Sequence, residues 1–128
     1  PKDADAESSP IIYVVDDTLE PDDFNVVTNK ETINVKVCSE TDAKIQRLKT
    51  TPEGNMIVLN SVVLPVIMEV LLVIKECDRQ NDTTNDSKRW CVAFRNKLEE
   101  MGVDLSQVNS LLDPAIKILE KPFSNISA

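Results

Sequence analysis

Hydrophobic residues follow two different spacings along this chain. Ile11–Val15 is a run of β-branched and aromatic residues bounded by proline and aspartate, which is typical of a short strand. Ile33, Val35 and Val37 alternate with polar or small residues, the period of two that marks a half-buried strand. From residue 39 onward the apolar spacing becomes helical. The pattern therefore predicts an extended N-terminal segment followed by helices.

A first helix is expected over about 40–49, and a much longer helix follows it. Thr51 and Pro52 form a hydroxyl N-cap followed by proline at the first helical position. Residues 56–74 are then apolar around most of the helical circumference, as in a helix buried among neighbours or in lipid. Pro65 should kink this helix because proline lacks an N–H and clashes with the preceding turn. Ser61, Pro65, Glu69 and Glu76 fall within one narrow stripe of this helix.

Two further helical segments complete the pattern. Trp90, Phe94, Leu98 and Met101 recur on one face of an amphipathic helix. Gly102 is placed to end that helix in the left-handed conformation. The last segment, 104–122, carries two aspartate caps.

These elements predict a mainly α protein. About four helices should pack around the long apolar helix, kinked at Pro65, with a short N-terminal extended or β segment. Residues 1–9 are small and acidic and are expected to form a disordered tail. Residues 10–128 should form a single globular domain, with an extended acidic arm over 10–38 and a helical body over 39–122.

Composition removes several classes of function. The chain has 128 residues, no histidine and two glycines. Without histidine there is no Ser-His-Asp triad and no histidine-bearing zinc site, and two glycines are too few for a phosphate-binding or dinucleotide-binding loop. A net charge of -8 argues against binding nucleic acid. We expect no enzyme activity, cofactor or metal, and no nucleic-acid partner.

The charge is concentrated at one end of the chain. Residues 1–42 contain 11 acidic and 3 basic side chains, whereas residues 43–128 contain 11 of each. The whole imbalance therefore belongs to the N-terminal third, where its field would attract a basic partner.

The acidic residues of this third are interleaved with apolar ones in a candidate partner-binding segment. Its members are Asp16, Asp17, Leu19, Glu20, Asp22, Asp23 and Phe24. Charge would steer another protein with a basic surface toward it, and the two apolar side chains would anchor that protein. The segment resembles the acidic tails of anticoagulants from blood-feeding animals. The alternative is an exposed connector that Leu19 and Phe24 pin to the core.

Cysteine spacing suggests one disulfide. The cysteines are Cys38, Cys77 and Cys91, so at most one internal bridge forms. Cys77 lies near the end of one expected helix and Cys91 near the start of the next, which makes them the favoured pair. Cys38 would then be free, buried or joined to another chain in a homodimer. The alternative is three buried thiols in a reduced cytosolic protein.

Three N-x-[ST] sequons point toward secretion. Asn81 and Asn85 lie in a polar loop, and Asn125 lies near the C-terminus, which are places where a glycan can be accommodated. The loop lacks the residue spacing of a calcium-binding loop. We expect a secreted, glycosylated protein.

The sequence therefore favours a secreted, non-enzymatic binding or effector protein that acts through protein–protein interaction. In general type it resembles small secreted effectors of invertebrate saliva, venom or parasite secretions. One alternative is a helical carrier of a small apolar ligand, with Glu69 or Lys75 orienting the head group. Another is a single membrane span over 56–74, against which the Glu69 carboxylate and the need for a shared core both count.

Overall fold

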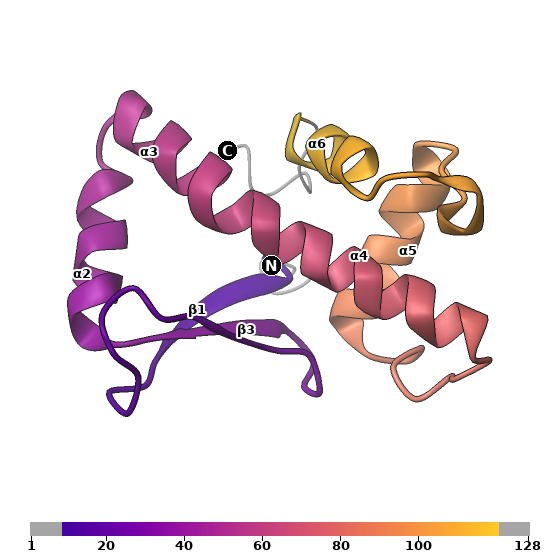
Figure 1. The fold of residues 1–128 in the computed structure, drawn as a ribbon, viewed down its shortest axis with the longest axis horizontal. Coiled ribbons are helices and arrows are strands. Elements are labelled where there is room, and N and C mark those ends of the chain that lie inside the picture. The colour runs from indigo at the N-terminus through magenta and orange to yellow at the C-terminus, as the bar shows by residue number, and fades with distance from the viewer. Residues whose placement is uncertain (1–8, 121–128) are drawn as a thin grey trace, which may run out of the picture.

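The fold is a small sheet packed against helices (Figure 1). The computed structural model describes residues 9–120, so most of the expected 1–9 tail lies outside the described residues. The strands are β1 (Ile11–Val15), β2 (Asn25–Val27) and β3 (Ile33–Val37). The helical elements are α2 (Ser39–Leu48), α3 (Pro52–Val58), the π-helical turn η1 (Leu59–Val63), α4 (Leu64–Arg79), α5 (Arg89–Glu100), the 3₁₀ turn η2 (Leu105–Gln107) and α6 (Leu112–Glu120).

The expected mainly α fold is wrong, because the described residues form a mixed α/β structure. The N-terminal segment is a three-stranded sheet of order β1-β3-β2, in which β1 runs parallel and β2 antiparallel to β3. Val35 occupies the middle of the sheet, opposite Tyr13 on one side and Val26 on the other. The residues expected to form an extended arm thus form a layer of the fold.

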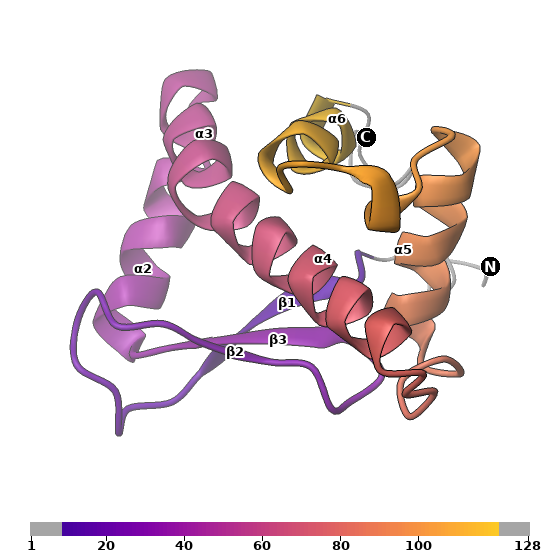
Figure 2. The ribbon, with the colours of Figure 1, turned by 45° about the vertical axis from the view of Figure 1, so that its right-hand side comes forward.

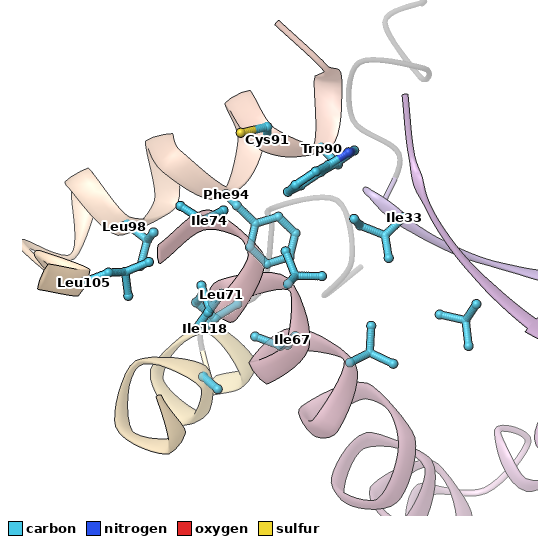
Figure 3. Close-up of a cluster of buried hydrophobic side chains, with 14 of the residues drawn as sticks. Ile33, Ile67, Leu71, Ile74, Trp90, Cys91, Phe94, Leu98, Leu105 and Ile118 are labelled. Carbon is cyan, nitrogen blue, oxygen red and sulfur yellow. The ribbon is translucent and has the colours of Figure 1, made fainter. Parts of the chain in front are cut away.

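The core lies between the sheet and the helices. Ile33, Val35 and Val37 on the inner face of β3 have no exposed surface, and they belong to the same buried cluster as the inward face of α4 (Figures 2 and 3). Helix α4 contributes Val66, Ile67, Val70, Leu71 and Ile74. The other helical elements contribute Trp90, Cys91, Phe94, Leu98, Leu105, Ala115 and Ile118.

Trp90 fastens α5 to the sheet. Its ring packs edge-on against Phe94, with ring centroids 6.4 Å apart. Its indole Nε1–H donates to the carbonyl of Thr28 at 3.0 Å, and its backbone N–H donates to the carbonyl of Glu31 at 3.0 Å. The buried indole therefore satisfies its polar atom at the end of β2.

The long helix is continuous from Pro52 to Arg79 and irregular in the turn before Pro65. The N–H of Leu64 bonds to the carbonyl of Leu59, five residues earlier, which is a π-type hydrogen bond. Pro65 has no N–H to donate, and its ring crowds the carbonyl of the preceding turn, which favours an irregular turn at this point of the helix. The proline expected to kink the helix is thus preceded by a π-helical turn.

Two helix termini form as the sequence predicts. The hydroxyl of Thr51 accepts from the N–H of Gly54 at 3.0 Å. Gly102 has φ +69, and its N–H and the following N–H donate to the carbonyls of Glu99 and Leu98. That pair of hydrogen bonds is a Schellman motif.

Gly54 allows α2 and α3 to approach each other closely. A Cβ at Gly54 would lie 2.1 Å from the carbonyl oxygen of Leu48, whereas a Cβ at Gly102 would meet nothing within 4 Å. We expect Gly54→Ala to lower the free energy of unfolding by about 1–3 kcal/mol through overpacking. Gly102→Ala, a matched change limited to backbone strain, should cost about 1–2 kcal/mol. Urea denaturation measures both, and full stability of Gly54→Ala would refute the close approach.

Candidate partner-binding site

Two acidic residues of the predicted segment have structural roles. An Asp16 oxygen accepts from the N–H of Thr18 at 3.1 Å and from its hydroxyl at 2.6 Å. Asp17 accepts from the N–H and the hydroxyl of Ser39, each at 2.7 Å. These hydrogen bonds lower the pKa of both carboxyl groups. Asp16 and Asp17 therefore position the loop, through one carboxylate oxygen of Asp16 and both of Asp17.

Asp17 also provides the side-chain cap of α2. The helix follows Cys38, whose side chain makes no capping hydrogen bond. The sequence resembles a capping box at Ser39 and Asp42, but the acceptor for the Ser39 N–H comes from Asp17, 22 residues earlier. The N–H of Asp22, at φ 70, donates to the hydroxyl of Thr41 at 3.0 Å. The loop is thus held against the first turn of α2 at two points.

The other predicted residues remain available to a partner. Glu20, Asp22 and Asp23 are exposed, and none forms an ion pair with another described residue. Phe24 is 42% exposed, and Leu19 is half-buried. The structure therefore divides the predicted segment into two anchoring aspartates and an exposed acidic–aromatic part.

Phe24 joins the acidic loop to a groove between β2 and the long helix. The groove has a volume of about 250 Å³. It is lined by Phe24, Asn25, Val26, Ser61, Val62, Pro65, Val66 and Glu69. We call these eight residues the β2–α4 groove. The helical wall of the groove was not predicted as a site, although the stripe of Ser61, Pro65 and Glu69 was its visible signal in the sequence.

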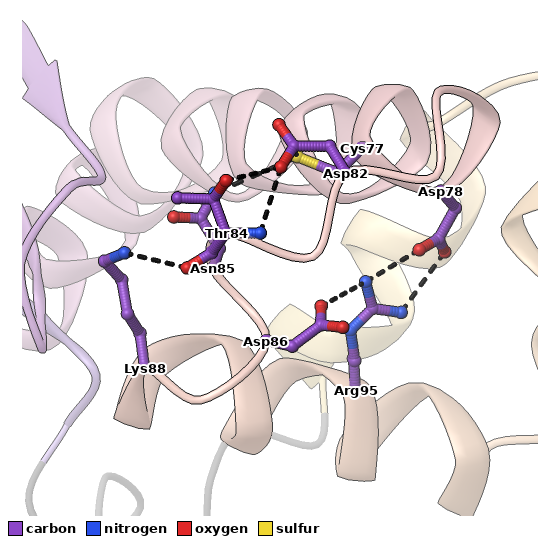
Figure 4. A network of polar contacts seen from close by, with 8 residues as sticks. All are labelled: Cys77, Asp78, Asp82, Thr84, Asn85, Asp86, Lys88 and Arg95. Carbon is purple, nitrogen blue, oxygen red and sulfur yellow. Dashed lines mark hydrogen bonds and ion pairs between the residues drawn. The ribbon is translucent and has the colours of Figure 1, made fainter.

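The cysteines do not form the expected bridge. Cys38, Cys77 and Cys91 are free thiols, and the structure gives the predicted Cys77–Cys91 disulfide no support. Instead, the Cys77 sulfur lies 3.9 Å from both the Asn85 amide nitrogen and an Asp82 oxygen (Figure 4). Burial, reinforced by the Asp82 charge, raises the pKa of the Cys77 thiol. Cys38 is buried at the start of α2, so the predicted homodimer through Cys38 would require that turn to open.

Two ion pairs of Arg95 join α5 to the last turn of α4 and to the polar loop between the two helices. The Arg95 guanidinium donates to Asp78 at 2.7 and 3.2 Å and to Asp86 at 3.4 Å (Figure 4). The hydrogen bond to Asp78 is the main cause of the raised pKa of Arg95. The polar loop is therefore closed by charge-assisted hydrogen bonds.

The sequons occupy different environments. Asn81 is exposed at the turn, with φ 56, whereas Asn85 is half-buried and its amide faces Cys77. Asn125 lies outside the described residues. Asn81 is thus the more accessible of the two described sequon asparagines.

The long helix contains the residues on which the two alternative functions, a membrane span and a carrier of an apolar ligand, were based. Pro52–Arg79 is long and apolar enough to cross a membrane, as the core helix of a soluble protein also is, and 33% of its most apolar window is buried. Glu69 is exposed at the rim of the β2–α4 groove, and the Lys75 ammonium lies 3.5 Å from the Val108 carbonyl. Residues 9–120 contain no cluster of three metal-ligating side chains.

Comparison of the chain with protein-family models, with curated proteins and with solved structures finds no match.

The capping role of Asp17 makes stability depend on pH. Because the folded pKa is lowered, the ionised carboxylate stabilises the fold above its unfolded pKa of about 3.9. That contribution is lost as the pH falls through the folded value. We expect Asp17→Asn to destabilise the protein at pH 7 and to lose much of its deficit near pH 2. Asp23→Asn, at an exposed carboxylate with no hydrogen bond or ion pair to a described residue, should have little effect at pH 7. Thermal unfolding across pH measures this, and a deficit independent of pH would contradict the capping role.

Proposed function

We propose that this protein is a non-enzymatic binding protein that docks another protein through its exposed acidic loop and the adjoining β2–α4 groove. The position of Phe24 carries this proposal. Phe24 is a large, part-exposed aromatic ring next to Asp22 and Asp23, and it lines the β2–α4 groove. Partly exposed aromatic anchors beside charged residues are typical of interaction hot spots.

Charge favours a basic partner. Residues 10–42 contain eight acidic and two basic side chains, and they form the sheet, its loops and the start of α2. Exposed carboxylates on this side of the protein would accelerate association with a basic surface and weaken it at high salt. The loop is already folded onto α2, so binding would order few additional residues.

The binding test uses point variants, because deleting residues 1–24 would remove β1 from the sheet. The protein is immobilised, and extracellular fluid from its source is passed over it at low and at physiological salt. A variant with Glu20→Gln, Asp22→Asn and Asp23→Asn should lose most retention of a specific protein, as should Phe24→Ser, about tenfold or more for a hot spot.

The matched control changes three exposed acids elsewhere, Glu53, Glu99 and Glu100, to glutamine. It should retain the same protein as the unaltered chain, since none of these residues lies in the loop or in the β2–α4 groove. If the control and the loop variants lose retention equally, retention depends on net charge alone and not on the acidic loop. Equal retention by all of them would refute the docking site.

We further propose that the protein is secreted and carries a glycan at Asn81. The exposed position of Asn81 supports this proposal, whereas a glycan at Asn85 would have to displace its amide from Cys77. In protein secreted from eukaryotic cells, Asn81→Gln should remove one glycan mass, and Asn85→Gln should remove none. Intact mass spectrometry measures this, and an unmodified Asn81 in secreted protein would count against the proposal.

A further inference from the structure

The direction of the backbone groups of β2 follows from the ladder on the other side of β3. The N–H of Ile33 donates to the carbonyl of Pro10 at 2.7 Å, and the N–H of Asp16 donates to the carbonyl of Val37 at 2.7 Å. In a parallel ladder, one residue of a strand bonds to both neighbours of its partner, and the next residue points the other way. The odd-numbered residues of β3 therefore direct their backbone groups toward β1.

The even-numbered residues of β3 consequently face β2. Asn34 pairs with Val27, and Lys36 pairs with Asn25, so these two residues of β2 direct their backbone groups back to β3. Val26 lies between them, so its N–H and its carbonyl point in the plane of the sheet, away from β3. Among residues 9–120, β2 has a strand neighbour on one side only. The N–H and carbonyl of Val26 therefore have no backbone partner among the described residues and face an open sheet edge.

The surroundings of this edge differ at its two ends. Beyond Val26, the Thr28 carbonyl accepts the Trp90 indole N–H, so that end is already occupied. Before Val26, the chain leads into Phe24 and the exposed acidic loop. Alongside the edge runs the β2–α4 groove, with Glu69 on its helical wall. The outward-facing N–H and carbonyl of Val26, the β2–α4 groove with its apolar and polar side chains, and the carboxylates of the loop therefore lie together.

We propose, building on the proposed function, that a basic, extended segment of the partner adds to the edge of β2 as a further strand. Its backbone pairs with the N–H and carbonyl of Val26. An apolar side chain of that strand enters the groove beside Phe24 and Pro65, and a basic side chain reaches Glu69. Strand addition of this kind takes affinity from the backbone and specificity from alternate side chains.

Charge selects this occupant over a second copy of the chain. A symmetric dimer through β2 would bring together two chains that each carry a net charge of -8, and these like charges would repel. Lys36, the lysine within the described strands, pairs with Asn25 and lies on the face opposite Val35 and Val26. The edge is thus acidic on its binding side and complementary to a basic strand.

The test uses a seven-residue peptide of alternating lysine and valine as the probe. It is titrated into the ¹⁵N-labelled full chain at low salt and followed by NMR. The Val26 amide should shift downfield and become protected from exchange. The same peptide with its valine amides N-methylated cannot donate backbone hydrogen bonds and should bind about tenfold more weakly. A glutamate–valine peptide should not bind.

Matched variants of the long helix locate the side-chain contact. Glu69→Gln should weaken binding of the lysine–valine peptide several-fold. Glu53→Gln, the same change at another exposed position of the long helix outside the groove, should leave binding unchanged. Equal weakening by both variants would overturn the assignment of Glu69.

Three results of the peptide titration would overturn edge pairing. They are the absence of peptide binding, binding that leaves the Val26 amide unperturbed, and equal affinity for the N-methylated peptide. Protection of Val26 that rises with protein concentration, without peptide, would assign the edge to a second copy and also overturn it. If a natural partner is retained in a way that depends on the acidic loop, but the Val26 amide does not change when that partner binds, edge pairing is wrong and the proposed function still holds.

Discussion

Burial of the inner face of β3 against α4 is the interaction on which the rest of the structure depends. Ile33, Val35 and Val37 are fully buried, and each such side chain contributes on the order of 1.5–3 kcal/mol when removed from water. Because β3 is the middle strand, its position fixes β1 and β2 on either side. The acidic third of the chain is therefore held to the helices through an apolar strand within it.

This packing also determines which groups the sheet exposes to a partner. The loop between β1 and β2 is fixed at both ends by strands that pair with β3, and Asp17 and Asp22 tie it to α2. Such a loop presents its carboxylates and Phe24 in a defined arrangement, which reduces the entropy lost on binding. The same packing places β2 at the edge of the sheet, where Val26 has no strand beside it. The acidic loop and the open edge thus have a common structural origin.

Local pattern predicted a good part of this fold. The strands at Ile11–Val15 and Ile33–Val37, the Thr51 cap and the Gly102 terminus all follow from short-range rules. β2 was missed because a strand of three residues, Asn25–Val27, is too short to show a period. Without it, the alternation in β3 indicated an extended segment and not a sheet.

The candidate site was predicted only in part, because its two walls are far apart in sequence. The acidic loop was visible as a run of charge, but Val62 and Glu69 meet it only through the packing of α4 on the sheet. The role of Asp17 depends on a contact with Ser39, 22 residues later in the sequence. The role of Val26 depends on the register of β2 against β3. The predicted Cys77–Cys91 disulfide rested only on the closeness of two helix ends. In the structure, the ion pair between Asp78 of α4 and Arg95 of α5 links these two helices instead.

Native-state hydrogen exchange shows directly whether β3 is a core strand and whether β2 forms an open sheet edge. The amides of Ile33, Val35 and Val37 should exchange as slowly as those of α4. Asn25 and Val27 should be protected, whereas Val26 between them should exchange rapidly. Rapid exchange throughout residues 10–38, or equal protection of all three β2 amides, would rule out this arrangement of the sheet.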